Sequence, residues 1–149
     1  MQFPSFDDRK YSSNSITMIW LKRIGLILLV ISLGTVIDYF THQTSPFFSV
    51  AFAYFPHKIL YGTLWGFVGY LVFKKYLTTP FRVNFTVALT PAVLLQTMYY
   101  IQGHLMTWVV LLFLVGHFFM FMLPGHYIFR KYRNLFIDGP SLPPVPPQV

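Results

Sequence analysis

Hydrophobic residues along the chain gather into four long segments separated by short polar stretches. The segments cover residues 16–42, 56–76, 83–101 and 106–129. A helix of about 20 apolar residues crosses the hydrocarbon core of a bilayer, which is about 30 Å thick. The pattern therefore predicts an all-α integral membrane protein with four transmembrane helices in an up-down bundle.

The two ends of the chain depart from this pattern. Residues 1–14 are polar and lack hydrophobic periodicity, which predicts a mobile cytoplasmic tail. The first apolar segment is too long for the core of a cleavable signal peptide, so it is expected to act as a signal anchor. Residues 137–149 are rich in proline and predict a second tail, extended or disordered. A single transmembrane domain, residues 15–136, is expected between them.

Residues 43–56, which connect the first two segments, are rich in aromatic side chains. Ser45-Pro46 has the pattern of a helix start, with serine as the N-cap and proline at the first helical position. The apolar run that follows is too short to span a bilayer, so we expect a short helix or loop lying in the interface. Pro56 is expected to open the second spanning helix.

The composition also indicates that much of the protein surface contacts lipid. Hydrophobic residues make up 55% of the chain and charged residues only 10%, whereas soluble proteins carry about 25% charged residues. The net charge of +7 comes from short basic clusters at the ends of the apolar segments. Such clusters are typical of topology signals and of contacts with anionic lipids at the cytoplasmic side. We therefore expect a lipid bilayer, and no nucleic acid, as the partner of these charges.

The basic residues also predict the orientation of the chain. Ten of the eleven lysines and arginines fall on one side of the predicted bundle. These ten are Arg9, Lys10, Lys22, Arg23, Lys74, Lys75, Arg82, Arg130, Lys131 and Arg133. Only Lys58 falls on the other side. Because positive charges are retained in the cytoplasm, a multi-pass protein of the cell membrane with both termini cytoplasmic is predicted.

One polar side chain in each predicted helix lies at a similar depth. Counting about 1.5 Å per residue from the inner basic boundary places Asp38 at roughly 22 Å and Lys58 at roughly 24 Å. The same count places Gln96 at roughly 21 Å and His117 at roughly 20 Å. Intramembrane charges normally pair, so the structural interpretation is a buried Asp38–Lys58 ion pair completed by the other two side chains. A proton or solute path through this layer is the functional interpretation.

Metal binding is an alternative for the same region. Asp38 and His42 lie one helical turn apart and on the same face as Ser32 and Thr35. His57 and His104 could complete an outward-facing set. Carboxylate and imidazole ligands suit zinc or manganese, and an open coordination position would allow hydrolysis of a lipid-linked substrate. The positive charge of the neighbouring Lys58 disfavours a divalent cation, and the chain has no cysteine for thiolate ligation.

A stripe of small residues marks one face of the second predicted helix. Gly62, Gly66 and Gly69 lie on this face and would let another helix approach closely. The stripe is expected to pack either inside the monomer or against a second copy. The sequence as a whole predicts a non-enzymatic membrane component, which would be an assembly partner of a membrane protein or a small transporter subunit. A metal-dependent membrane hydrolase is the alternative.

Overall fold

The computed structural model describes residues 6–44, 50–103 and 107–137. The helices, in chain order, are α1 (Phe6–Gln43), α2 (Tyr54–Phe73), the 3-10 turn η2 (Lys74–Tyr76), α3 (Pro80–Ile101), α4 (Thr107–Lys131) and α5 (Arg133–Phe136). These described residues contain no strand, so the all-helical class expected from the sequence is confirmed for them.

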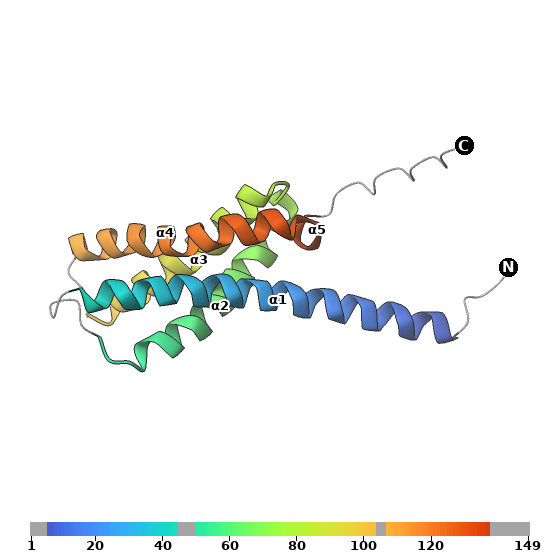
Figure 1. Ribbon diagram of the computed structural model, residues 1–149, viewed down its shortest axis with the longest axis horizontal. Helices are drawn as coiled ribbons and strands as arrows, with labels where there is room; N and C mark the ends of the chain where they lie inside the picture. Colours follow the sequence, from blue (N-terminus) through green and yellow to red (C-terminus); the bar gives the residue numbers. More distant parts are fainter. Residues whose placement is uncertain (1–5, 45–49, 104–106, 138–149) are drawn as a thin grey trace.

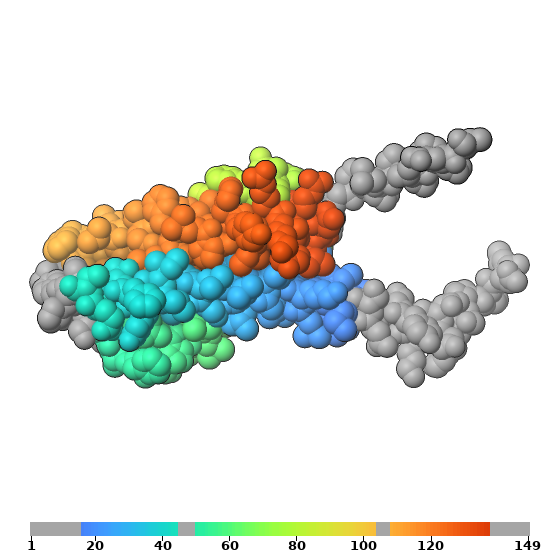
Figure 2. Space-filling model, in the orientation of Figure 1, coloured from blue at the N-terminus to red at the C-terminus, as the bar shows by residue number. Residues whose placement is uncertain are grey.

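The four long helices pack side by side (Figure 1). α1 contacts α2 and α4, and α3 also contacts α2 and α4, so that the four helices close into a ring. Short connections make consecutive helices run in opposite directions, and the first turns of α1 extend past the ends of the other three helices. In the space-filling view, α1 and α4 lie against each other across one face of the molecule (Figure 2).

Two helices of the described chain are long and apolar enough to cross a membrane. They are Ile16–Gln43 within α1 and Trp108–Lys131 within α4. Their length and composition agree with the first and fourth spanning segments expected from the sequence.

The start of α1 differs from the sequence-based expectation. The helix begins at Phe6, so α1 starts about ten residues before the apolar segment and includes part of the segment expected to be a tail. No proline or glycine lies between Phe6 and Gly25 to interrupt a helix. Adding residues to an existing helix costs far less than nucleating a new one. The polar segment can therefore continue the apolar helix without any hydrophobic periodicity of its own.

Prolines near the starts of α2 and α3 explain why both helices begin earlier than expected. α2 starts at Tyr54, two residues before Pro56, because proline is tolerated in the first turn, where the missing N–H has no intrahelical partner. α3 starts at Pro80, and the Thr79 side chain caps it by accepting a hydrogen bond of 3.3 Å from the backbone N–H of Arg82.

The interfacial element expected at Ser45-Pro46 lies outside the described residues, as does the tail after Ile137.

α3 continues through Pro91 without ending. Proline cannot donate a hydrogen bond to the carbonyl four residues earlier, which is that of Val87. This carbonyl faces Gly66 of α2, where an added β-carbon would lie 3.3 Å from its oxygen. Gly66, which has no side chain, therefore lies next to the Val87 carbonyl that lacks its helical hydrogen bond because of Pro91.

α4 repeats this arrangement against α1. Pro124 lies inside α4 and releases the carbonyl of Met120. A β-carbon added at Gly34 of α1 would lie 2.8 Å from the Met120 oxygen and 2.5 Å from the Phe121 ring. α4 continues through Pro124 to Lys131, and Gly34 lets α1 approach the carbonyl that this proline releases.

Arg23, one of the basic residues at the start of the first apolar segment, does not extend into solvent. Its side chain is buried, and Nε donates a hydrogen bond of 2.5 Å to the carbonyl oxygen of Leu135 near the end of the described chain. The guanidinium carbon also lies 4.6 Å from the centre of the Trp20 ring. Lys22, the neighbouring basic residue, is exposed. Arg23 therefore holds α5 against α1, a contact that joins residues 112 positions apart.

Candidate functional site

Asp38 of α1 is the centre of a buried cluster of polar side chains. Only 1% of its surface is exposed, and the same holds for Lys58 of α2. The Lys58 ammonium donates a hydrogen bond of 2.6 Å to Asp38 Oδ2. The other carboxylate oxygen, Oδ1, lies 3.0 Å from His117 Nε2 of α4. One carboxylate thus joins three helices.

Gln96 extends the cluster to α3, the one long helix not yet represented. Its Nε2 lies 2.7 Å from Nδ1 of His117, and both side chains are 2% exposed. If the amide donates, Nδ1 is the acceptor, and the proton of the neutral ring is on Nε2, beside Asp38 Oδ1. Asp38, Lys58, Gln96 and His117, called the polar network below, therefore connect one side chain from each long helix.

The structure thus brings together the four residues that depth counting placed in one layer. A helix advances 1.5 Å per residue, so residues at the same distance from a common boundary reach the same level. Which way each side chain faces is a separate matter, decided by how the helices are rotated against one another. All four face inward here.

His42 lies one turn beyond Asp38 on the same face of α1. Its Nε2 is 3.6 Å from Asp38 Oδ2, and only 5% of the residue is exposed. The imidazole stacks on Phe113 of α4, with the two ring planes 10° apart. His42 therefore lies next to the polar network, one turn of α1 closer to Gln43.

The metal-ligand set expected from the sequence is found in part. Asp38 and His42 come together with His117, and each of the three offers a ligand atom within 4.8 Å of the others. His57 is exposed, and its Nδ1 lies 2.6 Å from the Ala53 carbonyl of its own helix, so it takes no part in this group. His104 lies outside the described residues. His117 was missed as a ligand, although its estimated depth already matched that of Asp38.

Lys58 limits what the group of Asp38, His42 and His117 can bind. Its ammonium is 2.6 Å from the carboxylate oxygen that also faces His42. A divalent cation bound there would have to displace the ammonium or remain close to it. The Lys58 ammonium thus already occupies the position beside Asp38 where a metal ion would bind.

The small-residue face of α2 packs inside the chain. A β-carbon at Gly62 would lie 2.9 Å from the side chain of Ile31 in α1. A β-carbon at Gly69 would overlap the side chain of Thr90 in α3. The chain's own helices therefore fill this face, which leaves no room there for a second copy.

Asn84 of α3 is a buried polar residue that the sequence did not single out for a role. Its Nδ2 donates a hydrogen bond of 2.9 Å to the carbonyl of Met122 in α4, close to Pro124. The side chain is 1% exposed and lies where a β-carbon at Gly125 would be. The available signal was an amide side chain between Val83 and Val87 near the start of an apolar segment.

Comparison of this chain with protein-family models, with curated proteins and with solved structures found no significant match.

Proposed function

We propose that this protein is a non-enzymatic component of a cell membrane, with four spanning helices fastened together by the polar network. The distribution of polar and apolar side chains carries the proposal. Asp38 and Lys58 are 1% exposed, whereas Val72 is 66% exposed and Leu111 is 63% exposed. Water would favour the reverse arrangement, because large contiguous apolar surfaces are rare on soluble monomers.

Every long helix contributes to this apolar exterior. Exposed side chains include Leu28 and Leu33 of α1, Leu64 and Val72 of α2, Val93 and Ile101 of α3, and Leu111 and Phe119 of α4. α2 has 20 residues and α3 has 22, which at 1.5 Å per residue gives lengths of about 30 and 33 Å. These lengths support α2 and α3 as spanning helices beside α1 and α4.

The basic residues support an orientation with both termini in the cytoplasm. Lys74 and Lys75 belong to η2, Arg82 lies in the first turn of α3, and Arg130 and Lys131 end α4. These positions lie at the end of the molecule where α5 is found. Positive charges at that end favour the cytoplasmic side.

A structural role for the polar network is favoured by its charge and its surroundings. The Asp38 carboxylate and the Lys58 ammonium balance each other, which lowers the cost of placing either charge in a membrane. Toward the cytoplasmic end, the neighbouring layer is filled by Ile27, Ile31 and Val87, which expose no surface. This apolar layer favours an assembly partner over a subunit that conducts protons or solutes in this conformation.

Cysteine accessibility tests the proposed orientation. The chain has no cysteine, so single-cysteine variants can be made in the natural sequence without background. Thr44→Cys, Thr78→Cys and Gln102→Cys replace exposed residues in three successive connections. A membrane-impermeant maleimide applied to intact cells should label the first and third variants. Thr78→Cys should be labelled only after the cells are permeabilised.

The unmodified chain is the control, and it should remain unlabelled under both conditions. Labelling of Thr78→Cys alone in intact cells would mean the opposite orientation. Recovery of the protein in the soluble fraction, with all three cysteines equally reactive, would overturn the membrane assignment.

A metal-dependent role is the second candidate, because Asp38, His42 and His117 place three ligand atoms together. The group is buried, and catalysis at zinc requires a coordination position open to substrate. A bound ion here would therefore hold helices in place, and hydrolysis would first require an opening toward the outer side.

Metal content distinguishes this candidate from the non-metal proposal. Detergent-purified protein would be equilibrated with zinc, washed, and analysed for zinc per chain. A metal site predicts near-stoichiometric zinc that is lost in Asp38→Asn and in His117→Ala. The matched control His57→Ala removes an exposed imidazole and should keep the metal. Lys58→Met should raise occupancy by removing the competing charge. Zinc that is absent, or equal in all variants, would overturn the metal candidate.

A further inference from the structure

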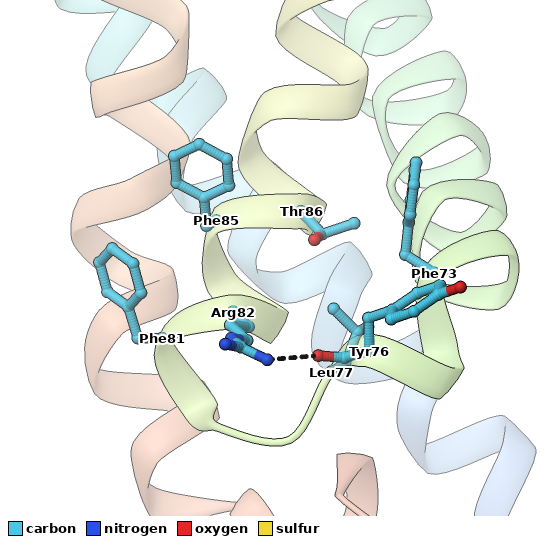
Figure 3. Close-up of a pocket in the computed structure, with 7 residues that line it drawn as sticks. All are labelled: Phe73, Tyr76, Leu77, Phe81, Arg82, Phe85 and Thr86. Atoms are coloured by element: carbon cyan, nitrogen blue, oxygen red, sulfur yellow. Dashed lines mark hydrogen bonds between the residues drawn. The ribbon is translucent and has the colours of Figure 1, made fainter.

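A pocket lies between the end of α2, the turn η2 and the start of α3 (Figure 3). Its volume is about 260 Å³. Phe73 and Tyr76 form the side nearer α2, and Phe81 and Phe85 form the side nearer α4. The walls are therefore aromatic, and the pocket is at the basic end of the molecule.

Among the described residues that line this pocket, Arg82 is the one that carries a charge. Its Nη1 donates hydrogen bonds to the Tyr76 carbonyl oxygen at 3.3 Å and to Thr78 Oγ1 at 3.2 Å. The first of these bonds is drawn in Figure 3. A guanidinium has five N–H donors. Within the described part of the chain, Nε and Nη2 have no hydrogen-bond partner, so the group is positioned by the turn with donors to spare.

The described residues of the elements around the pocket carry charge of a single sign. Lys75 is exposed in η2, a few residues before Arg82. The four acidic residues of the chain are Asp7, Asp8, Asp38 and Asp138, so none belongs to α2, η2 or α3. An anionic group at the rim would therefore meet positive charge and no carboxylate from these elements.

We infer that this pocket binds one anionic phospholipid of the cytoplasmic leaflet, with an acyl chain against the aromatic walls and the phosphate on Arg82. The inference rests on the proposed membrane orientation, which puts the pocket at the cytoplasmic surface. Arginine pairs well with phosphate because its planar fork donates two parallel hydrogen bonds. An apolar cavity beside a phosphate-binding group matches an amphiphile better than a free anion.

Lipid binding would be measured by native mass spectrometry of delipidated protein titrated with phosphatidylglycerol or with phosphatidylcholine. The natural chain should bind the first phosphatidylglycerol at least about tenfold more tightly than phosphatidylcholine, since one charge-assisted contact is worth about a factor of ten. Arg82→Gln should lose this preference. Lys22→Gln, which removes an exposed charge from α1 at the same end, should retain it.

A second variant keeps the charge and alters the cavity. Thr86 lines the pocket, and Thr86→Leu should fill part of it and weaken the binding of both lipids by about threefold to tenfold. Competition with inorganic phosphate tests whether the site binds a free anion instead of a lipid. Phosphate that competes with phosphatidylglycerol at millimolar concentration would show a simple anion site and overturn the lipid assignment. Circular dichroism of each variant would establish that the helices remain folded.

Failure of this inference is separable from failure of the proposed function. Cytoplasmic labelling of Thr78→Cys together with equal binding of both lipids would leave the membrane orientation intact and overturn the lipid site. Labelling of Thr78→Cys from outside would overturn the orientation, whatever the lipid preference in detergent. Equal loss of preference in Lys22→Gln and Arg82→Gln would show a diffuse surface charge instead of a site.

Discussion

At the scale of single residues, Asp38 decides how the centre of the molecule is organised. One of its oxygens faces Lys58 and His42, and the other faces His117. An unpaired charge inside a membrane costs at least about 2.5 to 3.5 kcal/mol on the insertion scale. In the proposed membrane setting, the pairing of Asp38 with Lys58 lowers this cost for both residues. Gln96 then fixes the imidazole that contacts the second oxygen.

Replacing Asp38 by asparagine tests this pairing. Asp38→Asn keeps the shape of the side chain but leaves the Lys58 ammonium buried without its counter-ion. Breaking a buried pair in this way costs about 3–5 kcal/mol, so the free energy of unfolding should fall by that amount. The double variant Asp38→Leu/Lys58→Met removes both charges and should be less destabilised than the single one.

Both free energies would be measured by unfolding in mixed detergent micelles, with the helical signal as the readout. The matched control is His57→Ala, which changes an exposed residue next to Lys58. A single variant as stable as the natural chain would refute the pairing. A double variant that is less stable than the single one would show that the network contributes stability beyond charge balance.

At the scale of helices, glycine and proline positions in neighbouring helices match each other. Each interior proline releases a carbonyl, and each released carbonyl approaches a glycine of the adjacent helix. Small residues at such contacts allow the close backbone approach on which packing in membranes depends. The helices are therefore held together by two kinds of contact. Polar side chains join them in the network, and close backbone approaches join them at these glycines.

Gly34→Ala should destabilise the contact between α1 and α4. The new β-carbon would lie 2.8 Å from a backbone oxygen of Met120, which can move only if α4 moves. Overpacking of this kind costs about 1–3 kcal/mol. Gly25→Ala is the control on the same helix, because nothing lies within 4 Å of its added β-carbon. The free energies of unfolding of the two variants would be compared, and equal values would contradict the close approach.

At the scale of the whole molecule, the polar and apolar surfaces are reversed relative to a soluble protein. A few charged and amide side chains are buried within an apolar core among the four helices, and many leucine, valine and phenylalanine side chains are exposed on the exterior. Most basic residues gather at one end, where Arg23 also fastens α5 to α1. The proposed lipid site at Arg82 belongs to this end. Each feature is what a bilayer with a negatively charged inner surface would favour.

The helical class and the depth of the polar residues were predictable from the sequence. A helix rises by a constant amount per residue, so apolar segment lengths and distances from basic boundaries are enough to place Asp38, Lys58, Gln96 and His117 at one level. The expected starts of α2 and α3 differ from the observed starts by only two or three residues. The start of α1 was misplaced further, because a polar helix without periodicity resembles a tail in sequence.

Only the tertiary structure decided which of these residues meet. Depth does not determine how a helix is rotated about its axis, and rotation turns His117 toward Asp38 while His57 stays exposed. The same applies to Arg23, whose partner at Leu135 is supplied by a segment 112 residues away. The glycine face of α2 could also have packed against a second copy, and the packing of α1 and α3 against it decided otherwise. Sequence alone determined how far along the helices each group lies, and packing determined which groups face one another.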